Sequence, residues 1–284
     1  NNGDVESVEG NVGGFIGWSA NGGAEIISGI NNGDIKGSSS IGGFVGYNTQ
    51  QLTVTDSINT GNVVSFGSTH AAGTSGGILG AQRQDASVRT ATITGCYNSG
   101  IVSAKADFEG YGRYNPIMPQ LYDNIAVITV SDCYYLAVNP ETDLDAYEGT
   151  TALALDVFKA KDTRLADLTF VTVTMNKPEN AYVSVSAPSG SVYAKTGSDF
   201  IATVTPVEKG YELTASNVEF VMDETEGCYV YEIDAIAADA EISVTVEAVI
   251  IVDAVITPGA DTVVATGTLL PYLANGITDY LKIA

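Results

Sequence analysis

The sequence is poor in positive charge. Its 284 residues contain 12 Lys and Arg against 34 Asp and Glu, which gives a formal net charge of −22. Because nucleic-acid binding draws mainly on Lys and Arg, this balance argues against a nucleic-acid partner, and it also disfavours an anionic membrane surface. No apolar run approaches the length of about 18 residues that a membrane-spanning helix needs. We therefore expect no membrane insertion.

Histidine and cysteine are also scarce. His70 is the only histidine, so a Ser-His-Asp or Cys-His site would have to use it. It lies in a loop-like segment far in sequence from any cysteine, and we predict no catalytic residue. Three cysteines are too few for the disulfide framework of a small secreted domain.

The sequence does contain a repeated phrase rich in Gly, Asn and β-branched residues. A Gly-Gly-apolar-x-Gly motif occurs at 13–17, 42–46 and 76–80, and an apolar-Asn-x-Gly motif occurs at 30–33, 58–61 and 97–100. Each repeat alternates short strand-like runs with turn residues. Self-similarity at this period is typical of a solenoid, whose units bury their apolar faces only by stacking. A parallel β-helix, in which each strand pairs with its equivalent one repeat away, fits this pattern.

In such a stack, equivalent residues form columns about 4.8 Å apart. We expect the asparagine column to hydrogen-bond along the stack and to tolerate left-handed backbone. The glycines after it should supply positive φ, and Phe15, Phe44 and Ile78 should be buried in one column. The predicted columns are Ile30, Ile58, Tyr97 and Tyr134; Asn31, Asn59 and Asn98; and Gly33, Gly61 and Gly100.

Cys96 and Cys133 occupy one of these columns in successive repeats, above Gly29 and Ser57. The separation of one repeat lies within the Cα range of a disulfide, so this pair is a disulfide candidate. The alternative is two small buried thiols that fill a narrow corner.

The repeated phrase resembles the GLUG-type repeats of bacterial surface and secreted proteins. The resemblance covers about residues 1–135 and rests on Gly-Gly-Phe-(Val/Ile)-Gly at 13–17 and 42–46 and on the Ile-Asn-x-Gly motif. It implies a right-handed parallel β-helix, an adhesin-like role and a place at the bacterial cell surface or outside the cell. The fourth repeat keeps only Glu109-Gly110-Tyr111-Gly112 where the Gly-Gly-Phe is expected.

The pattern changes after the repeats, and the sequence predicts four parts. Residues 1–137 form the β-helix, and residues 138–169 form an acidic loop and a short helix over 151–168 that caps the last coil. Residues 170–248 alternate with period two and predict a small β-sandwich or β-grasp-like module; they resemble the divergent internalin-B-type repeats of bacterial surface proteins. Residues 249–284 are an apolar extension or the start of a further domain.

Two groups of residues are candidate binding sites. Tyr111, Tyr114 and Tyr122 lie in an irregular aromatic segment that could stack on sugars or cover the last coil. The second group, Glu141, Asp143, Asp145 and Glu148, could bring oxygens together around Ca²⁺. This segment lacks the glycine and the closing glutamate of an EF-hand loop, and it also fits a solvated acidic loop. We expect no other cofactor.

Together these features predict a non-enzymatic extracellular adhesin or structural stalk, with a protein or glycan surface ligand. One alternative is a subunit of an extracellular filament that pairs with itself through strands. The chain begins within a repeat, so we expect an open strand edge there, which upstream coils or a neighbour's residues 249–284 would cover. A second alternative is a carbohydrate-active β-helix enzyme such as a polysaccharide lyase, although the repeats contain no acidic column and few bases.

Overall fold

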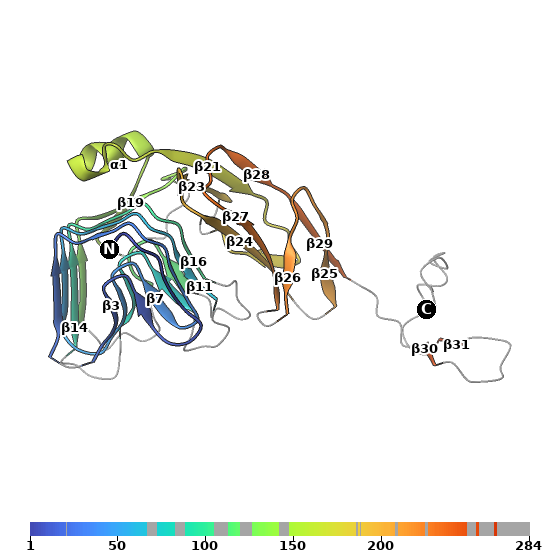
Figure 1. The fold of residues 1–284 in the computed structure, drawn as a ribbon, viewed down its shortest axis with the longest axis horizontal. Coiled ribbons are helices and arrows are strands. Elements are labelled where there is room, and N and C mark those ends of the chain that lie inside the picture. The colour runs from blue at the N-terminus through green and yellow to red at the C-terminus, as the bar shows by residue number, and fades with distance from the viewer. Residues whose placement is uncertain are drawn as a thin grey trace.

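The computed structural model describes residues 1–20, 22–66, 73–82, 89–104, 113–119, 127–141, 148–185, 187, 189–207, 210–224, 227–248, 254–255 and 264–265. Among these residues the regular elements are almost all β-strands, with one α-helix, α1 (Leu155–Lys161), and one 3-10 helix, η1 (Thr163–Leu165). The all-β class that the repeats predict is therefore confirmed (Figure 1).

The strands described between residues 5 and 153 form five parallel sheets. The first contains β1 (Val5–Ser7), β6 (Ile35–Gly37), β11 (Val63–Ser65) and β16 (Val102–Ala104). The second contains β2 (Val12–Gly13), β7 (Ser40–Gly42), β12 (Thr74–Gly76) and β17 (Arg113–Asn115). The third contains β3 (Ile16–Ser19), β8 (Val45–Asn48) and β13 (Leu79–Gln82). The fourth contains β4 (Ala24–Ile27), β9 (Leu52–Thr55), β14 (Thr90–Thr94) and β18 (Val127–Ser131). The fifth contains β5 (Ile30–Asn31), β10 (Ile58–Asn59), β15 (Tyr97–Asn98), β19 (Cys133–Leu136) and β20 (Thr150–Leu153).

Each strand pairs with the equivalent strand of the next repeat. Ile58 pairs with Ile30 on one side and with Tyr97 on the other, and Tyr97 pairs with Tyr134, as the predicted column requires. The rings of Tyr97 and Tyr134 stack with their centroids 5.5 Å apart. We call the strands of one repeat a level: β1–β5 form the first level, β6–β10 the second, β11–β15 the third and β16–β19 the fourth.

The asparagine column forms a continuous hydrogen-bonded ladder. Asn31 Nδ2 donates to Asn59 Oδ1 at 2.8 Å, and Asn59 Nδ2 donates to Asn98 Oδ1 at 2.7 Å. This confirms the predicted hydrogen bonding along the stack. The ladder also extends to Asn1, whose Nδ2 donates to Asn31 Oδ1 at 2.8 Å, a member that the sequence pattern did not reveal.

The prediction of positive φ at Gly33, Gly61 and Gly100 is wrong. None of them is among the residues with positive φ. A Cβ on Gly61 would instead lie 2.0 Å from the carbonyl oxygen of Gly33, so glycine is required because successive levels approach closely. The left-handed backbone lies a few residues earlier, in a column of its own that comprises Ser28, Asp56, Gly95 and Asp132, with φ of 54°, 51°, 63° and 52°.

The apolar core runs through the levels as predicted, with one correction at its end. Phe44 and Ile78 are fully buried, but Phe15 is 46% exposed although its ring stacks on that of Phe44 at 5.0 Å. Phe15 belongs to the first level and is covered only from the side of the second.

The fourth level aligns with the others differently from the sequence prediction. Asn115 pairs with Gly76, and the carbonyl of the buried Ile117 accepts from the N–H of Ile78. In the fourth level, Asn115-Pro116-Ile117 therefore occupies the position that Gly-Gly-Phe occupies in the first two levels. The prediction that Glu109–Gly112 occupies this position is wrong.

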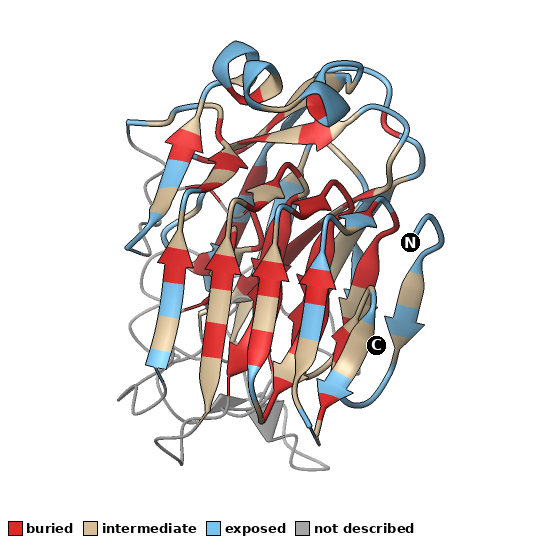
Figure 2. Cartoon of the chain, turned by 90° about the vertical axis from the view of Figure 1, so that its left-hand side faces the viewer, coloured by how far each residue is buried: buried red, intermediate tan, exposed pale blue. Residues whose placement is uncertain are grey.

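Helix α1 covers the outer face of the fifth sheet. Phe158 and Leu165 are fully buried against Ile58, and the Phe158 ring meets the edge of Tyr97 at a centroid distance of 6.2 Å. The sequence predicted a helix over 151–168 that caps the last coil. The helix is shorter, because Thr150–Leu153 is strand β20, and it lies along the side of the stack (Figures 1 and 2).

Alternating exposure along the strands matches a sheet with one face on the core. In the fourth sheet Leu52 and Val54 are buried, whereas Thr53 and Thr55 are half-buried. Figure 2 shows this alternation as bands of colour along neighbouring strands.

Residues 170–248 form a second, mainly antiparallel part. Its strands are β21 (Phe170–Met175), β22 (Ala181–Val183), β23 (Ser191–Lys195), β24 (Phe200–Pro206), β25 (Tyr211–Ser216), β26 (Val221–Asp223), β27 (Cys228–Ile233), β28 (Ala240–Ile242) and β29 (Val244–Ala248). They form sheets in the orders β23-β21-β28, β22-β24-β27-β26 and β25-β29, around a core that includes Val173, Phe200 and Ile242. Beyond them, β30 (Ala254–Val255) and β31 (Val264–Ala265) pair with each other, and the rest of the predicted extension over 249–284 lies outside the described residues.

Candidate functional site

The predicted tyrosine site lies only partly within the described residues. Tyr114 is on β17, where it pairs with Ser75, and its half-buried side chain packs against a cluster that includes Ile41 and Val63. Tyr111 and Tyr122 lie outside the described residues. The one tyrosine that is placed therefore contributes to packing between levels.

The predicted Ca²⁺ site has the same limit. Glu141 and Glu148 are exposed, and Asp143 and Asp145 lie outside the described residues. Within the part of the chain that the structure describes, no three Asp, Glu, His or Cys side chains are grouped as metal ligands. His70 also lies outside that part.

Cys96 and Cys133 are adjacent and both are free thiols. The residues that follow them, Tyr97 and Tyr134, are register partners, so Cys96, just before β15, and Cys133, at the start of β19, occupy equivalent positions in successive levels. Both side chains are fully buried in the core. Cys228, in the antiparallel part, is also buried and forms no disulfide.

The first level has an unusually apolar exposed surface. Ile30 is 37% exposed, whereas its column partner Ile58 in the second level is 1% exposed. Large apolar side chains that share this exposure on the first level are Val8, Phe15, Trp18, Ile27 and Ile30. The sequence predicted an open strand edge here, but it did not predict the exposure of Phe15, the one side chain of this group that belongs to the predicted core column.

Trp18 and Tyr47 form an exposed aromatic pair on the outer face of the third sheet. They are register partners on β3 and β8, and their ring centroids lie 6.5 Å apart with the planes tilted by 39°. Trp18 is 59% exposed and Tyr47 is half-buried. Strand alternation does not predict this outward position, because Tyr47 lies two residues after Val45, which is buried in the core. The sequence therefore contained no signal for this pair.

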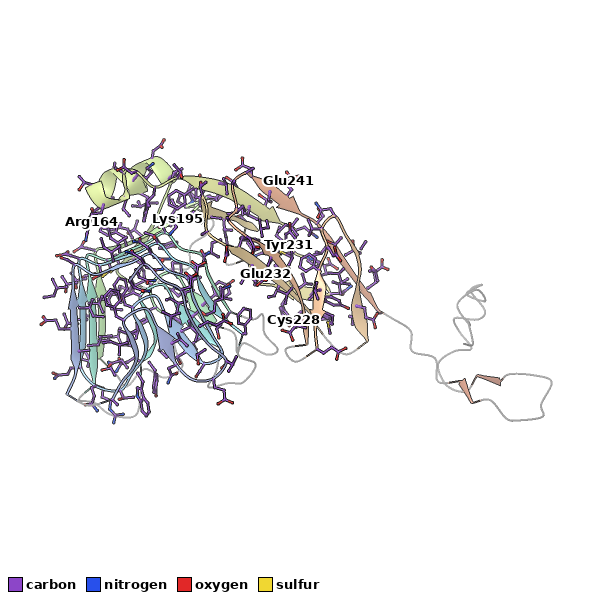
Figure 3. All side chains as sticks on the ribbon, viewed as in Figure 1. Arg164, Lys195, Cys228, Tyr231, Glu232 and Glu241 are labelled. Atoms are coloured by element: carbon purple, nitrogen blue, oxygen red, sulfur yellow. The ribbon has the colours of Figure 1, made fainter. Side chains whose placement is uncertain are left out.

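A polar cluster joins the parallel and antiparallel parts. Lys195 Nζ, on β23, donates to the Asn32 carbonyl at 3.2 Å and to Thr60 Oγ1 at 3.1 Å, and Figure 3 shows it where the two parts meet. Asn62 Nδ2 donates to the Asp199 carbonyl at 2.7 Å. Ile101 of the parallel part packs into the core of the antiparallel part. The three hydrogen bonds connect residues more than 130 positions apart, and no local sequence pattern predicts them.

Burial shifts the titration of two charged groups in this cluster. The pKa of Asp34 is raised, mainly by burial and further by the neighbouring Asp4, while the Asn62 backbone N–H that donates to it at 2.7 Å opposes the shift. The pKa of Lys195 is lowered by burial, and the charges of Asp34 and Asp4 oppose that change. A cavity of about 10 Å³ is lined by Asp34, Asn62 and Asp199. A second cavity, of about 40 Å³, lies between Ser99 of the parallel part and Tyr193 of the antiparallel part.

Comparison with protein families, curated proteins and solved structures finds no match to this chain. No helix in the described part of the chain is both long and apolar enough to cross a membrane.

Proposed function

We propose that this chain is a non-enzymatic extracellular adhesin of the bacterial cell surface, built on a right-handed parallel β-helix. The observation that supports the β-helix is the unbroken parallel register from the first level to the fourth, with like residues in like positions. Right-handed connection is the strong preference for parallel strands. The resemblance of the repeats to GLUG-type repeats supports the same fold and location.

The contacts between levels favour a rigid scaffold. The asparagine ladder and the stacked rings of Tyr97 and Tyr134 link successive levels. The antiparallel part packs on the side of this stack through Lys195 and Asn62. A rigid stack with a packed second part can present a binding surface at a fixed distance from an anchor, which is what an adhesin or a stalk requires.

The ligand that we propose is a glycan, bound on the outer face of the third sheet. Trp18 and Tyr47 offer two aromatic faces at the surface, and aromatic rings with polar edges suit the apolar faces of sugar rings in water. The net charge of −22 favours neutral over acidic glycans.

A glycan array with the purified protein tests this proposal. We expect saturable binding to neutral glycans that Trp18→Ala lowers at least tenfold. Val8→Ala, which removes an apolar side chain that is more exposed than Trp18 but not aromatic, is the matched control and should leave binding unchanged. Absence of binding across neutral glycans, or equal loss in both variants, would contradict the glycan ligand. Release of shortened or unsaturated oligosaccharides during incubation would contradict the non-enzymatic role.

A second candidate function, a filament subunit, is favoured by the apolar exposure of the first level. Phe15, Ile27 and Ile30 would be covered if another copy or another strand paired there. Light scattering after size exclusion separates the two functions. A filament subunit should form concentration-dependent assemblies that Ile27→Ser and Ile30→Ser disperse. A protein that stays monomeric at all concentrations would exclude the filament subunit and leave the adhesin as the remaining function.

A further inference from the structure

We propose that Cys96 and Cys133 are a disulfide-forming pair that covalently joins the third level to the fourth. Cys96 directly precedes β15 and Cys133 begins β19, and Tyr134 N–H donates to the Cys96 carbonyl at 2.9 Å. This inference goes beyond the proposed function and does not depend on it.

The backbone geometry permits the bond. Adjacent parallel strands lie about 4.8 Å apart, and disulfides join Cα atoms about 4.4–6.8 Å apart. Both side chains point into the same core cluster. The thiols have matching surroundings, because Cys96 Sγ lies 3.4 Å from the Thr94 carbonyl oxygen and Cys133 Sγ lies 3.3 Å from the Ser131 carbonyl oxygen. Because each sulfur lies against a carbonyl of its own level, formation of the disulfide requires a change of side-chain rotamer.

The contact between the thiols also assigns their roles. The interaction between the two thiols lowers the pKa of Cys133, and the same interaction together with burial raises the pKa of Cys96. Cys133 is therefore the thiol that more readily becomes the attacking thiolate.

The oxidant that we name is a small disulfide such as oxidised glutathione. The Cys133 thiolate attacks one of its sulfurs, forms a mixed disulfide and releases one glutathione thiolate. Cys96 then loses its proton and attacks the Cys133 sulfur, which releases the second glutathione thiolate. The protein dithiol is oxidised to a disulfide, and one glutathione disulfide is reduced to two thiols.

The position of the pair explains what the bond would add. The asparagine ladder ends at Asn98, because its register partner in the fourth level is Tyr135. The amide-to-amide hydrogen bond that joins the first three levels is therefore absent between Asn98 and Tyr135, where the stacked rings of Tyr97 and Tyr134 and the Thr94–Ser131 hydroxyl contact at 3.1 Å join the third level to the fourth. In the second level the equivalent position is Ser57, whose hydroxyl donates to the Thr55 carbonyl at 2.9 Å and accepts from the Gly29 N–H at 3.0 Å. Cysteine thus occupies this column where the ladder stops.

The test is a count of thiols after refolding. Because both sulfurs are buried, the denatured full chain is refolded in a glutathione redox buffer or in excess reductant, and thiols are alkylated in denaturant and counted by mass spectrometry. We expect one alkylated thiol, Cys228, in the oxidised sample and three in the reduced sample. Unreduced peptide maps should link the peptides of Cys96 and Cys133, and the oxidised protein should unfold at a higher denaturant concentration.

Cys96→Ser is the matched variant, because serine occupies the same column position in the second level. It should fold and keep two alkylated thiols in either buffer. Three alkylated thiols in wild-type protein that has refolded in the redox buffer, or a disulfide that includes Cys228, would overturn the proposal. If refolding is inefficient, the same count on native protein held with oxidised glutathione in sub-denaturing urea decides the matter.

Discussion

Asn31 and Asn59 lie in adjacent levels, and the side-chain amide of Asn31 donates to the side-chain oxygen of Asn59 at 2.8 Å. The second N–H of each amide is also used, since Asn31 Nδ2 donates to the Gly33 carbonyl and Asn59 Nδ2 to the Gly61 carbonyl. Each amide thus binds its own turn and its neighbour. Buried polar groups in such a fully satisfied row cost little, whereas the loss of one member leaves unpaired groups on both sides.

The first prediction concerns the middle of this ladder. Asn59→Ala should lower the free energy of unfolding by about 2–4 kcal/mol, because the amide of Asn31 and the oxygen of Asn98 both lose a buried partner. The measurement is chemical denaturation. Asn2→Ala is the control: this exposed side chain accepts from Asn32, and its loss should cost less than about 0.5 kcal/mol. Similar losses in the two variants would contradict the importance of the ladder.

The second prediction compares residues in and beside the apolar column. Phe44→Ala should lower the free energy of unfolding by about 3–5 kcal/mol, because it opens a cavity in a fully buried site. Thr55→Ala, on the outer face of the fourth sheet, should cost under about 0.5 kcal/mol. Phe15→Ala should cost less than half as much as Phe44→Ala, because the Phe15 ring is already partly in water. Equal shifts in the denaturation midpoints of Phe44→Ala and Thr55→Ala would refute the register.

The columns could be predicted from the sequence because strand pairing in register repeats the same chemistry at a fixed interval. Ile58 and Asn59 occupy the positions that the repeated phrase implies. The exposure of Phe15 could not be predicted in the same way, because burial depends on whether a further level covers the residue. The same motif gives a buried Phe44 and a half-exposed Phe15.

The third prediction concerns the close approach of successive levels. Gly61→Ala should lower the free energy of unfolding by about 1–3 kcal/mol. The added Cβ would lie 2.0 Å from the Gly33 carbonyl oxygen, so the two levels would have to separate. Gly3→Ala is the control, since no atom lies within 4 Å of its added Cβ. Thermal denaturation followed by circular dichroism measures both. Equal melting temperatures for the two variants would contradict the assigned register of the glycines.

The candidate sites were harder to predict than the fold. The adjacency of Cys96 and Cys133 followed from the repeat period. The contact between Asn62 and Asp199 could not be predicted from the sequence, because it joins two parts with different sequence patterns across 137 positions. A sequence repeat specifies what lies one level away, but it contains no information on which side of the stack the antiparallel part covers.

The buried carboxyl of Asp34 lies at that interface, and its titration has a definite sign. Its folded-state pKa is raised above the ordinary value of 3.8, so the folded chain binds this proton more tightly than the unfolded chain does. Ionisation of Asp34 therefore lowers the stability of the folded state as the pH rises through the raised pKa. The cost is absent below the unfolded pKa, where both states carry the proton.

The fourth prediction follows from this sign. Asp34→Asn keeps an oxygen that can accept from the Asn62 N–H but removes the titration. The unfolding free energy of the variant minus that of wild type should therefore increase as the pH rises from about 3.8 through the raised pKa, and then stay constant up to neutral pH. Denaturation in urea at a series of pH values measures this difference. Glu25→Gln, which removes a negative charge from an exposed position of β4, separates the effect of burial from that of net charge. A difference in unfolding free energy that does not change with pH, or one that changes equally for Glu25→Gln, would show that burial of the ionised Asp34 carboxylate does not destabilise the folded state.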